Sequence, residues 1–553
     1  MTTLDIRKSG SLSIEEAKRF SQLAISISDE YNDYIEDLVL QNNVKGEQYV
    51  LQVVCRNTYM SKIYDRMCRL AFIEDRLKAG EVYTSVLTDS RSLKDPIEFL
   101  LNKYKSKAKI INNEKKYFSF FIRVYLSLRN FYICLNLWIW PKFFWFKKDP
   151  IDDAYFLDTF IFKDSFDYDS NFKDRYYTSL LEKVDFKLRD KIWYVPTLHG
   201  FRYPWEWIRL FYRVKNSNAN ILLKENYLKT FDYISAYLKS FTLGSAIRVI
   251  PKWRENDISC IVKEEVFNER GSFSITQSLL IYKFIERVRN KNIRLKGVID
   301  WYENQNIDRA LYLGVKEYYP GVKVKGYLGF VPQNYYLGLW PQKFEKDGGV
   351  LPDELLVIGD RFIPRINKSL PEMKVTSAPA FRFANPPNLN QKPNKRNIIL
   401  LAMPMIIDEA RNIINIACEA SKNSNYRWLI KLHPVTSKKS FQKIIPNSLD
   451  CSFEYTNCKV TDLLYETHLL VTSASSVCLE AIVCETPVTI IGNRSGQTIN
   501  PLSGVIDQKF WSISYSARDL LNNITKTPST LRLNRKTIFS GVSQKSVNDM
   551  MNF

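Results

Sequence analysis

The chain contains few of the residues that build metal and disulfide sites. Its 553 residues include only three histidines, His199, His433 and His468, which lack the ligand spacing of a zinc site. Its nine cysteines are scattered without a Cys-x-x-Cys pair, so we expect free thiols in a reducing cytosol. The sequence therefore predicts neither a bound metal nor a disulfide framework.

Long apolar runs are missing as well. The first residues, MTTLDIRKSG, are polar and lack the apolar run of a secretory signal, so we expect a cytoplasmic protein. An aromatic stretch runs from Lys115 to Lys148, but its longest charge-free part covers only residues 130–141. Because a spanning helix needs about 20 apolar residues, this stretch is not expected to cross a membrane.

Length and composition indicate a globular protein with more than one domain. No repeat or low-complexity segment is present, and 45% of the residues are hydrophobic and 25% charged. The length exceeds that of one ordinary hydrophobic core. Proline and asparagine crowd residues 384–397, which we interpret as an interdomain linker. We expect an N-terminal domain over 1–383, with a basic aromatic insertion at about 94–190, and a C-terminal domain over 398–553.

The net charge of +20 indicates a polyanionic partner, either nucleic acid or an anionic membrane surface. Nucleic acid is disfavoured because the chain shows no binding motif of that class. In the aromatic stretch, by contrast, Phe, Trp and Tyr lie among arginines and lysines, which is typical of a helix in the headgroup region. We expect Trp138, Trp140, Phe143 and Phe144 to contact the inner membrane, and a buried core helix is the alternative.

Two motifs near the C-terminus predict a ligand site. Lys-Leu-His-Pro ends the apolar run YRWLIKL, and TSASSVCLEA continues the run HLLVT. Both runs are typical of buried parallel strands, whose carboxyl ends form the ligand edge of an open α/β sheet. The two serines are expected at the start of a helix, where N–H groups attract anions, although ordinary capping is the alternative. The predicted nucleotide pocket consists of Lys431, His433, Pro434, Ser475, Ser476 and Glu480.

These motifs, with the strand TPVTIIG that follows them, resemble the C-terminal domain of GT-B glycosyltransferases of bacterial surface polysaccharide (capsule and lipopolysaccharide) biosynthesis. The resemblance is to the transferases that use CMP-sugars of Kdo or sialic acid, and it covers about residues 396–511. It implies an α/β fold of two Rossmann-like domains facing a central cleft. It also implies that His433, Pro434, Ser475 and Ser476 contact the cytidine nucleotide and its phosphate. Glycerophosphotransferases and some UDP-sugar enzymes share a similar His-Pro and serine pair.

The catalytic base is expected in the N-terminal domain, because glycosyl transfer needs a group that deprotonates the acceptor hydroxyl. Glu303 is the first candidate, since WYENQN directly follows the apolar run LKGVID, and a helix-capping cluster is the alternative. His199 is the second candidate. Glu265 with Arg270 is the third, whereas Asp300 is expected to be buried in its strand.

The sequence as a whole predicts a metal-independent glycosyltransferase. The best interpretation is transfer of Kdo or sialic acid from a CMP-sugar to a lipid-linked surface glycan, by an enzyme peripheral to the inner membrane. His433 is expected to act in catalysis by stabilising negative charge on the departing phosphate. A UDP-sugar or CDP-glycerol type transferase of the same fold and a non-catalytic polysaccharide assembly protein are the alternatives.

Overall fold

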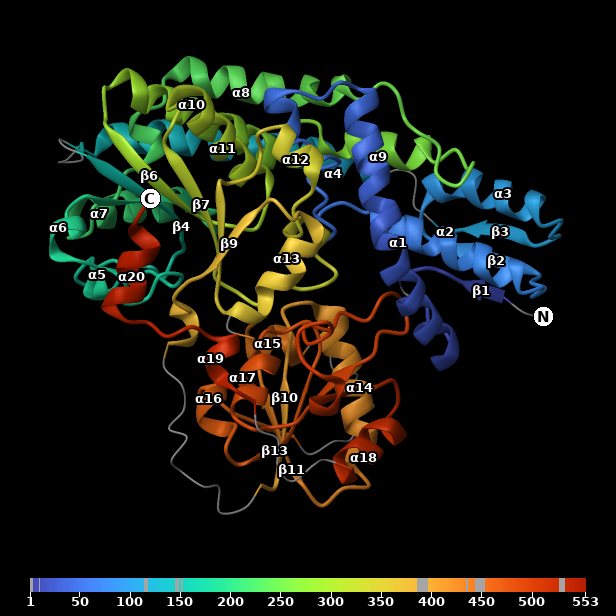
Figure 1. Cartoon of the computed structure of the whole chain (residues 1–553). Helices are drawn as coiled ribbons and strands as arrows, with labels where there is room; N and C mark the ends of the chain where they lie inside the picture. Colours follow the sequence, from blue (N-terminus) through green and yellow to red (C-terminus); the bar gives the residue numbers. More distant parts are fainter. Residues whose placement is uncertain are drawn as a thin grey trace.

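The computed structural model shows two α/β domains, one above the other, with a smaller lobe beside the upper one (Figure 1). It describes residues 3–8, 10–113, 118–144, 149–150, 153–384, 396–433, 436–442, 453–526 and 533–553.

The lower, C-terminal domain contains a six-stranded parallel sheet. Its inner strands are almost entirely buried and apolar, the pattern of a parallel sheet with helices on both faces. The strand order is that of the Rossmann fold, which confirms the strands predicted before His433 and before the serines. The order is β12 (Glu454–Tyr455), β11 (Arg427–Lys431), β10 (Ile398–Ala402), β13 (Thr467–Thr472), β14 (Val488–Ile491) and β15 (Trp511–Ser514). The helices are α14 (Ile407–Ser421), α15 (Lys438–Gln442), α16 (Val460–Leu463), α17 (Val477–Val483) and α18 (Ala517–Thr525).

The upper, N-terminal domain contains a second six-stranded parallel sheet, so the predicted α/β fold with two Rossmann-like domains is confirmed. Its order is β5 (Ile192–Leu198), β4 (Ala154–Ile161), β6 (Leu295–Trp301), β7 (Lys323–Leu328), β8 (Glu354–Val357) and β9 (Lys374–Ser377). The helices are α4 (Phe118–Ile139), α5 (Leu180–Lys183), α6 (Phe186–Arg189), α7 (Pro204–Asn216), α8 (Thr230–Thr242), α9 (Ser259–Glu269), α10 (Phe273–Asn290), α11 (Asn306–Tyr318), α12 (Lys343–Asp347) and α13 (Ile363–Ser369).

The smaller lobe has a three-stranded parallel sheet of its own. Its first helix starts at a capping box, in which Ser13 and Glu16 each bind the other's backbone N–H. The lobe consists of β1 (Thr3–Asp5), β2 (Ser85–Thr88), β3 (Lys109–Asn112), α1 (Ile14–Gln41), α2 (Ile63–Lys78) and α3 (Lys94–Lys103).

Two parts of the N-terminal half differ from what the sequence alone suggests. The run from Tyr49 to Cys55 is apolar like a buried strand, but it forms a 3-10 helix and turns. Its carbonyl groups at Tyr49, Val54 and Cys55 accept hydrogen bonds from the buried Arg309 guanidinium. These hydrogen bonds take the place of the backbone pairing with a neighbouring strand. The range 94–190, read as an insertion, contains β4, which pairs with both β5 and β6 and therefore belongs to the sheet.

The carboxyl edges of the two large sheets face one another. Gln333, after β7, donates to the carbonyl of Ala474, after β13, at 3.4 Å. Arg361, after β8, donates to the carbonyl of Val505 at 3.0 Å.

The linker expected at 384–397 lies mostly outside the described residues. The chain crosses back to the upper domain near its C-terminal end (Figure 1). The returning segment forms α19 (Arg535–Ile538) and α20 (Gln544–Met551).

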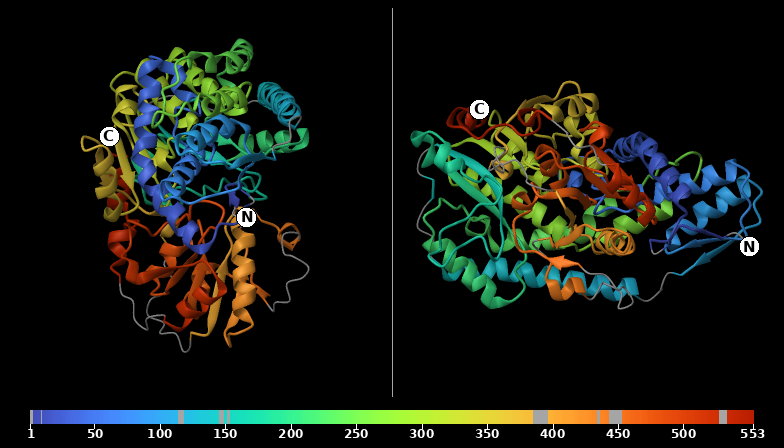
Figure 2. Two further views of the ribbon diagram at one scale, coloured as in Figure 1. Left: turned by 90° about the vertical axis from the view of Figure 1, so that its right-hand side faces the viewer. Right: turned by 90° about the horizontal axis from the view of Figure 1, so that it is seen from below.

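The aromatic segment forms α4, which lies at an outer edge of the N-terminal domain (Figure 2). Many of its apolar side chains are exposed, so a fully buried core helix is not observed. Trp138, Trp140 and Phe144, however, pack partly buried against the core, and of the four residues expected to contact a membrane only Phe143 is largely exposed. Among the described residues, no helix has the length and hydropathy of a membrane span.

Candidate functional site

Glu303 lies directly after β6, at the carboxyl edge of the N-terminal sheet. Its carboxylate accepts a hydrogen bond from Trp301 Nε1 at 2.9 Å and another from Gln305 Nε2. The predicted capping cluster exists, but the cap is Asp308, which accepts from the N–H groups of Glu303 and Gln305 at 3.0 Å each. The Glu303 side chain is therefore not used for capping and is held at the sheet edge by two side-chain donors.

Aromatic rings pack around Glu303, and Trp301 and Tyr327 are buried. Trp301 contacts Tyr176 at 4.2 Å between ring centroids and Tyr327 at 5.7 Å. Tyr176 also packs on Phe160 of β4. Burial raises the pKa of Glu303, while the hydrogen bonds from Trp301 and Gln305 and the charge of Arg382 oppose this shift. A raised pKa brings a carboxylate closer to the range in which a general base works.

His199 follows β5 on the same edge of the sheet, but it lies at the outer rim. It is exposed, and its ring packs edge-on against Phe162 with 5.5 Å between centroids. Partial burial and the charge of Arg129, on α4, lower its pKa. The structure thus brings His199 beside the aromatic helix and not beside Glu303.

On the C-terminal domain, Lys431 and His433 lie at the end of β11 as expected. Lys431 Nζ donates to the carbonyl of Asn457 at 3.0 Å, which ties it to the neighbouring loop. His433 is half-buried, and desolvation together with the charge of Arg382 lowers its pKa. Pro434 lies outside the described residues.

Ser475 and Ser476 precede α17, which has only seven residues. Ser476 occupies the N-cap position, but its hydroxyl makes no capping hydrogen bond. Ser475 Oγ accepts from the N–H of Val477 at 3.4 Å. The serine loop lies against the N-terminal domain through Gln333, which contacts Ala474. The predicted caps are thus at the expected positions, with weaker capping contacts than the sequence suggested.

A pocket of about 290 Å³ lies between the two domains beside Glu480. Burial raises the pKa of Glu480 to about 7, and the charge of Arg382 opposes this shift. Three arginines line the pocket: Arg175 from the loop after β4, Arg382 before the linker, and Arg535 from α19. The hydroxyl residues Thr178, Ser179 and Thr461 line it as well. Guanidinium groups and hydroxyls gathered in one pocket fit an anionic, hydroxyl-bearing ligand.

Arg382 connects the candidates of the two domains. Its charge contributes to the pKa shifts of Glu303, His433 and Glu480, so its guanidinium lies near all three. It also lies 6.0 Å from the Trp301 ring centroid. The Arg382 side chain is exposed and forms no ion pair with the residues that the structure describes. It is therefore a cation available to an anion in the cleft.

The local sequence explains why Arg382 points into the cleft. In Phe-Arg-Phe, both phenylalanines are buried. Phe381 packs on Tyr327 at 5.9 Å between centroids, and Phe383 stacks on Phe539 at 4.3 Å. These two anchors leave the arginine between them facing outward. Sequence reasoning missed it because Phe-Arg-Phe is not a known motif, and its only signal was a cation between two apolar residues before the linker.

Of the sequence candidates that the structure describes, only Glu480 lines this pocket. Glu265, on α9, accepts from the N–H of Lys62 at 3.2 Å and lies 3.8 Å from Arg66. Arg270 packs over Phe267. Both contacts are structural. Asp300 is buried in β6, as expected. Among the described residues, no group of histidines, cysteines and carboxylates is arranged to hold a metal ion.

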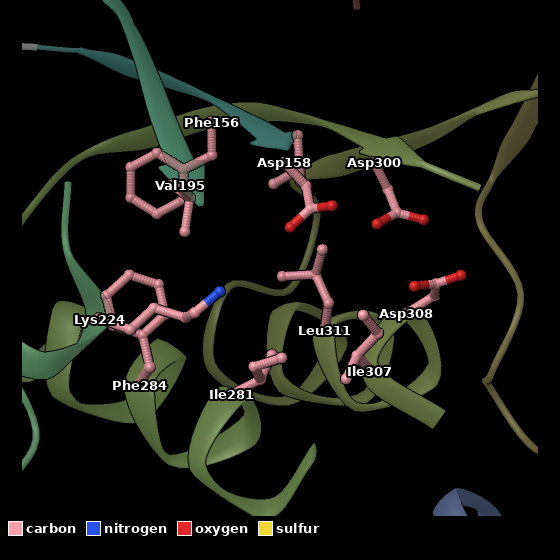
Figure 3. A pocket seen from close by; sticks show the side chains of 11 residues that line it. Phe156, Asp158, Val195, Lys224, Ile281, Phe284, Asp300, Ile307, Asp308 and Leu311 are labelled. Atoms are coloured by element: carbon pink, nitrogen blue, oxygen red, sulfur yellow. The ribbon is translucent and has the colours of Figure 1, made fainter. Parts of the chain in front are cut away.

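Asp300 belongs to a second, smaller cavity inside the N-terminal domain (Figure 3). Its volume is about 10 Å³, which is near the minimum for one water molecule. The carboxyl groups of Asp158, Asp300 and Asp308 point toward one another there, and Lys224 reaches in from the opposite side. Burial raises the pKa of Asp158 to about 7 and also raises the pKa values of Asp300 and Asp308.

We predict that the contribution of this acidic cavity to the free energy of unfolding falls as pH rises. The folded-state pKa of Asp158 lies above its unfolded value, so its contribution is complete below about pH 4 and is lost by about pH 7. Asp158→Asn should flatten the decline in free energy of unfolding across this window by on the order of 3 kcal/mol. Denaturant unfolding at a series of pH values measures this. Asp408→Asn, at an exposed ion pair with Arg411, is the control and should leave the curve unchanged. An equal change in free energy of unfolding across this window in the wild type and in Asp158→Asn contradicts the prediction.

Comparison with known proteins finds solved structures of low similarity and no relative by sequence. No protein-family model matches the chain, and no curated protein matches it in sequence. S. aureus MnaA, in a co-structure with UDP, is 9% identical, with a TM-score of 0.39 over 73% of this chain and 95% of that one. CalG4, the calicheamicin glycosyltransferase, is 12% identical, with a TM-score of 0.41 over 72% and 97%. The Neisseria meningitidis UDP-GlcNAc 2-epimerase bound to UDP-GlcNAc is 11% identical, with a TM-score of 0.38 over 68% and 91%.

Proposed function

We propose that this chain is a glycosyltransferase that takes its sugar from a nucleotide sugar bound in the arginine-lined pocket. The observation that carries the proposal is the position of Arg382, which lines the pocket with Glu480 of the C-terminal domain and lies 6.0 Å from the ring centroid of Trp301, the hydrogen-bond donor to Glu303. An acceptor on the aromatic edge of the N-terminal sheet would thus lie opposite a nucleotide on the C-terminal sheet. Ligands of open α/β sheets bind at such strand ends.

The side chains at the site supply the two functions that glycosyl transfer requires. Glu303, held by Trp301 and Gln305, would accept the proton of the acceptor hydroxyl as the new glycosidic bond forms. Arg382 and His433 would stabilise the negative charge that develops on the departing nucleotide phosphate. Arginine suits this task because its planar guanidinium can donate two parallel hydrogen bonds to a phosphate.

We further propose that the donor is a CMP-sugar of Kdo or sialic acid and that the acceptor is a lipid-linked surface glycan. The support is the similarity of the Lys431-Leu-His433-Pro434 and Ser475-Ser476 motifs to those of CMP-sugar transferases. Glu480, which lines the pocket one turn into α17, would bind the ribose hydroxyls. A UDP-sugar donor is the alternative, and the same experiment distinguishes the two.

A panel of nucleotides should raise the melting temperature of the protein selectively. A ligand that binds only the native state stabilises it, by about 2.7 kcal/mol at a hundredfold excess over its Kd. CMP is expected to give a larger shift than UDP or GDP, and EDTA is expected to change little. Differential scanning fluorimetry measures both effects. A shift with UDP alone removes the CMP-sugar assignment, and no shift with any nucleotide contradicts the transferase proposal itself.

A further inference from the structure

One helix of the N-terminal domain exposes an unusual amount of apolar surface. On α4, the large apolar side chains of Phe121, Tyr125, Leu128 and Phe131 are between 52% and 69% exposed. The inner side of the same helix is fixed by Asn130, whose amide donates to the Gly271 carbonyl at 2.9 Å and to Thr276 at 3.0 Å. The exposed side is therefore opposite the side that packs on the domain, at whose outer edge α4 lies (Figure 2).

The helices α7 and α8 flank α4 and extend this surface. Tyr132 of α4 donates to the carbonyl of Arg202, just before α7, and Trp138 donates to Thr230 of α8, both at 3.0 Å. Each flanking helix has its own exposed apolar row at helical spacing. The rows are Trp205, Ile208 and Tyr212 on α7, and Phe231, Ile234 and Leu238 on α8. Nearly half of the large apolar side chains that are exposed in the described chain lie on α4, α7 and α8.

The charges on this three-helix face are positive. The sequence of α4 contains Arg123 and Arg129 and no acidic residue. On α7, Arg209 and Lys215 are exposed, whereas the single acid, Glu206, is paired with Lys163 at 2.7 Å. The acid of α8, Asp232, is buried against Arg287 at 2.6 Å. Among the described residues, the face thus combines aromatic side chains with Arg129, Arg209 and Lys215, which are in no ion pair, and the acids on its helices are both paired.

We propose that the three-helix face of α4, α7 and α8 binds an anionic membrane surface, with its apolar side chains in the headgroup region. Aromatic side chains favour this interfacial zone, and nearby lysines and arginines are attracted to anionic lipid. The helices lie on the membrane and do not cross it, in line with the absence of a spanning helix among the described residues. A second copy of the chain would carry the same positive charge, which makes it a poorer complement to this face.

A chain of neighbouring residues connects the three-helix face with the candidate pocket. The meaning of this connection rests on the proposed function. Arg129 of α4 influences the pKa of His199, whose ring packs on Phe162. Phe162 in turn lies 5.0 Å below the Arg175 guanidinium, and Arg175 lines the pocket. An acceptor anchored in the membrane by a lipid would thus meet the cleft at the His199 rim.

Vesicle co-sedimentation of the full chain tests the proposal without nucleotide or acceptor. Vesicles of phosphatidylcholine with phosphatidylglycerol should bind the protein, and vesicles of phosphatidylcholine alone should bind it at least about tenfold more weakly. A fourfold variant should lose about tenfold or more in binding to the anionic vesicles. Its substitutions, at residues 59–73% exposed, are Tyr125→Ser, Leu128→Ser, Trp205→Ser and Phe231→Ser.

A matched control variant replaces four apolar residues outside this face that are 58–82% exposed: Ile25→Ser, Leu40→Ser, Val82→Ser and Met405→Ser. It should bind vesicles like the wild type. The proposal is overturned if the wild type ignores anionic vesicles or if the fourfold variant binds as well as the control. It is also overturned if light scattering shows a dimer that the fourfold variant dissociates while vesicles have no effect. An unchanged melting temperature of the fourfold variant, and an unchanged nucleotide shift, separate this result from a failure of the transferase proposal.

Discussion

Replacement of Arg382 by alanine is expected to abolish the nucleotide-induced rise in melting temperature and nearly all transfer. Arg382 lies near Glu303, His433 and Glu480 and forms no ion pair with the described residues, so its charge is available to the nucleotide phosphate. Loss of one such donor costs on the order of 3 kcal/mol in the transition state, or roughly a hundredfold or more in rate. Sugar transfer from the preferred nucleotide sugar and the thermal shift measure the two effects.

Arg382→Lys and Arg427→Ala are the comparisons for this variant. Lysine keeps the charge but not the two parallel donors, so Arg382→Lys should recover part of the nucleotide shift. Arg427 forms an exposed ion pair with Glu454 on the far strands of the same domain and should tolerate alanine. Because the flanking Phe381 and Phe383 supply the local packing, Arg382→Ala should melt at the wild-type temperature without ligand. Normal nucleotide affinity in Arg382→Ala would place the phosphate elsewhere in the cleft.

The strands that carry the site could be predicted from the sequence, because each is a short apolar run followed by polar residues. LKGVIDW before Glu303 and YRWLIKL ending before His433 both form strands of parallel sheets. A parallel strand buried on both faces leaves this continuous signal in its own residues. Glu303, His433, Ser475 and Ser476 follow their strands at the expected positions for the same reason.

Features that depend on distant residues could not be predicted in the same way. The run from Tyr49 to Cys55 is apolar enough for a strand, but its carbonyl groups accept hydrogen bonds from the buried Arg309 of α11. Arg175, Arg382 and Arg535 meet only because the chain crosses between the domains twice. No sequence pattern around these arginines indicates which residues they contact. The anion site was therefore predicted at the serines and not at the arginines.

Glu303→Gln is expected to abolish transfer while the nucleotide-induced thermal shift remains. The glutamine keeps the size of the side chain and one acceptor for Trp301 Nε1, but it cannot take up a proton. Because burial raises the pKa of Glu303, wild-type transfer should increase with pH above about pH 4.3, the ordinary glutamate value, as the carboxylate forms. The residual rate of the variant should lack this dependence. Rate measurements across pH, with the CMP thermal shift at each pH, test both statements.

Glu265→Gln is the matched control, because burial raises the pKa of this carboxyl too, yet its contacts to Lys62 and Arg66 lie away from the pocket. It should retain transfer and its pH dependence. Loss of nucleotide affinity in Glu303→Gln would mean that Glu303 binds the donor, which is incompatible with its place on the acceptor side. Full activity in Glu303→Gln would instead leave His199 as the base. In that case His199→Ala should remove the activity, and the acceptor would lie at the rim beside α4, where His199 is exposed.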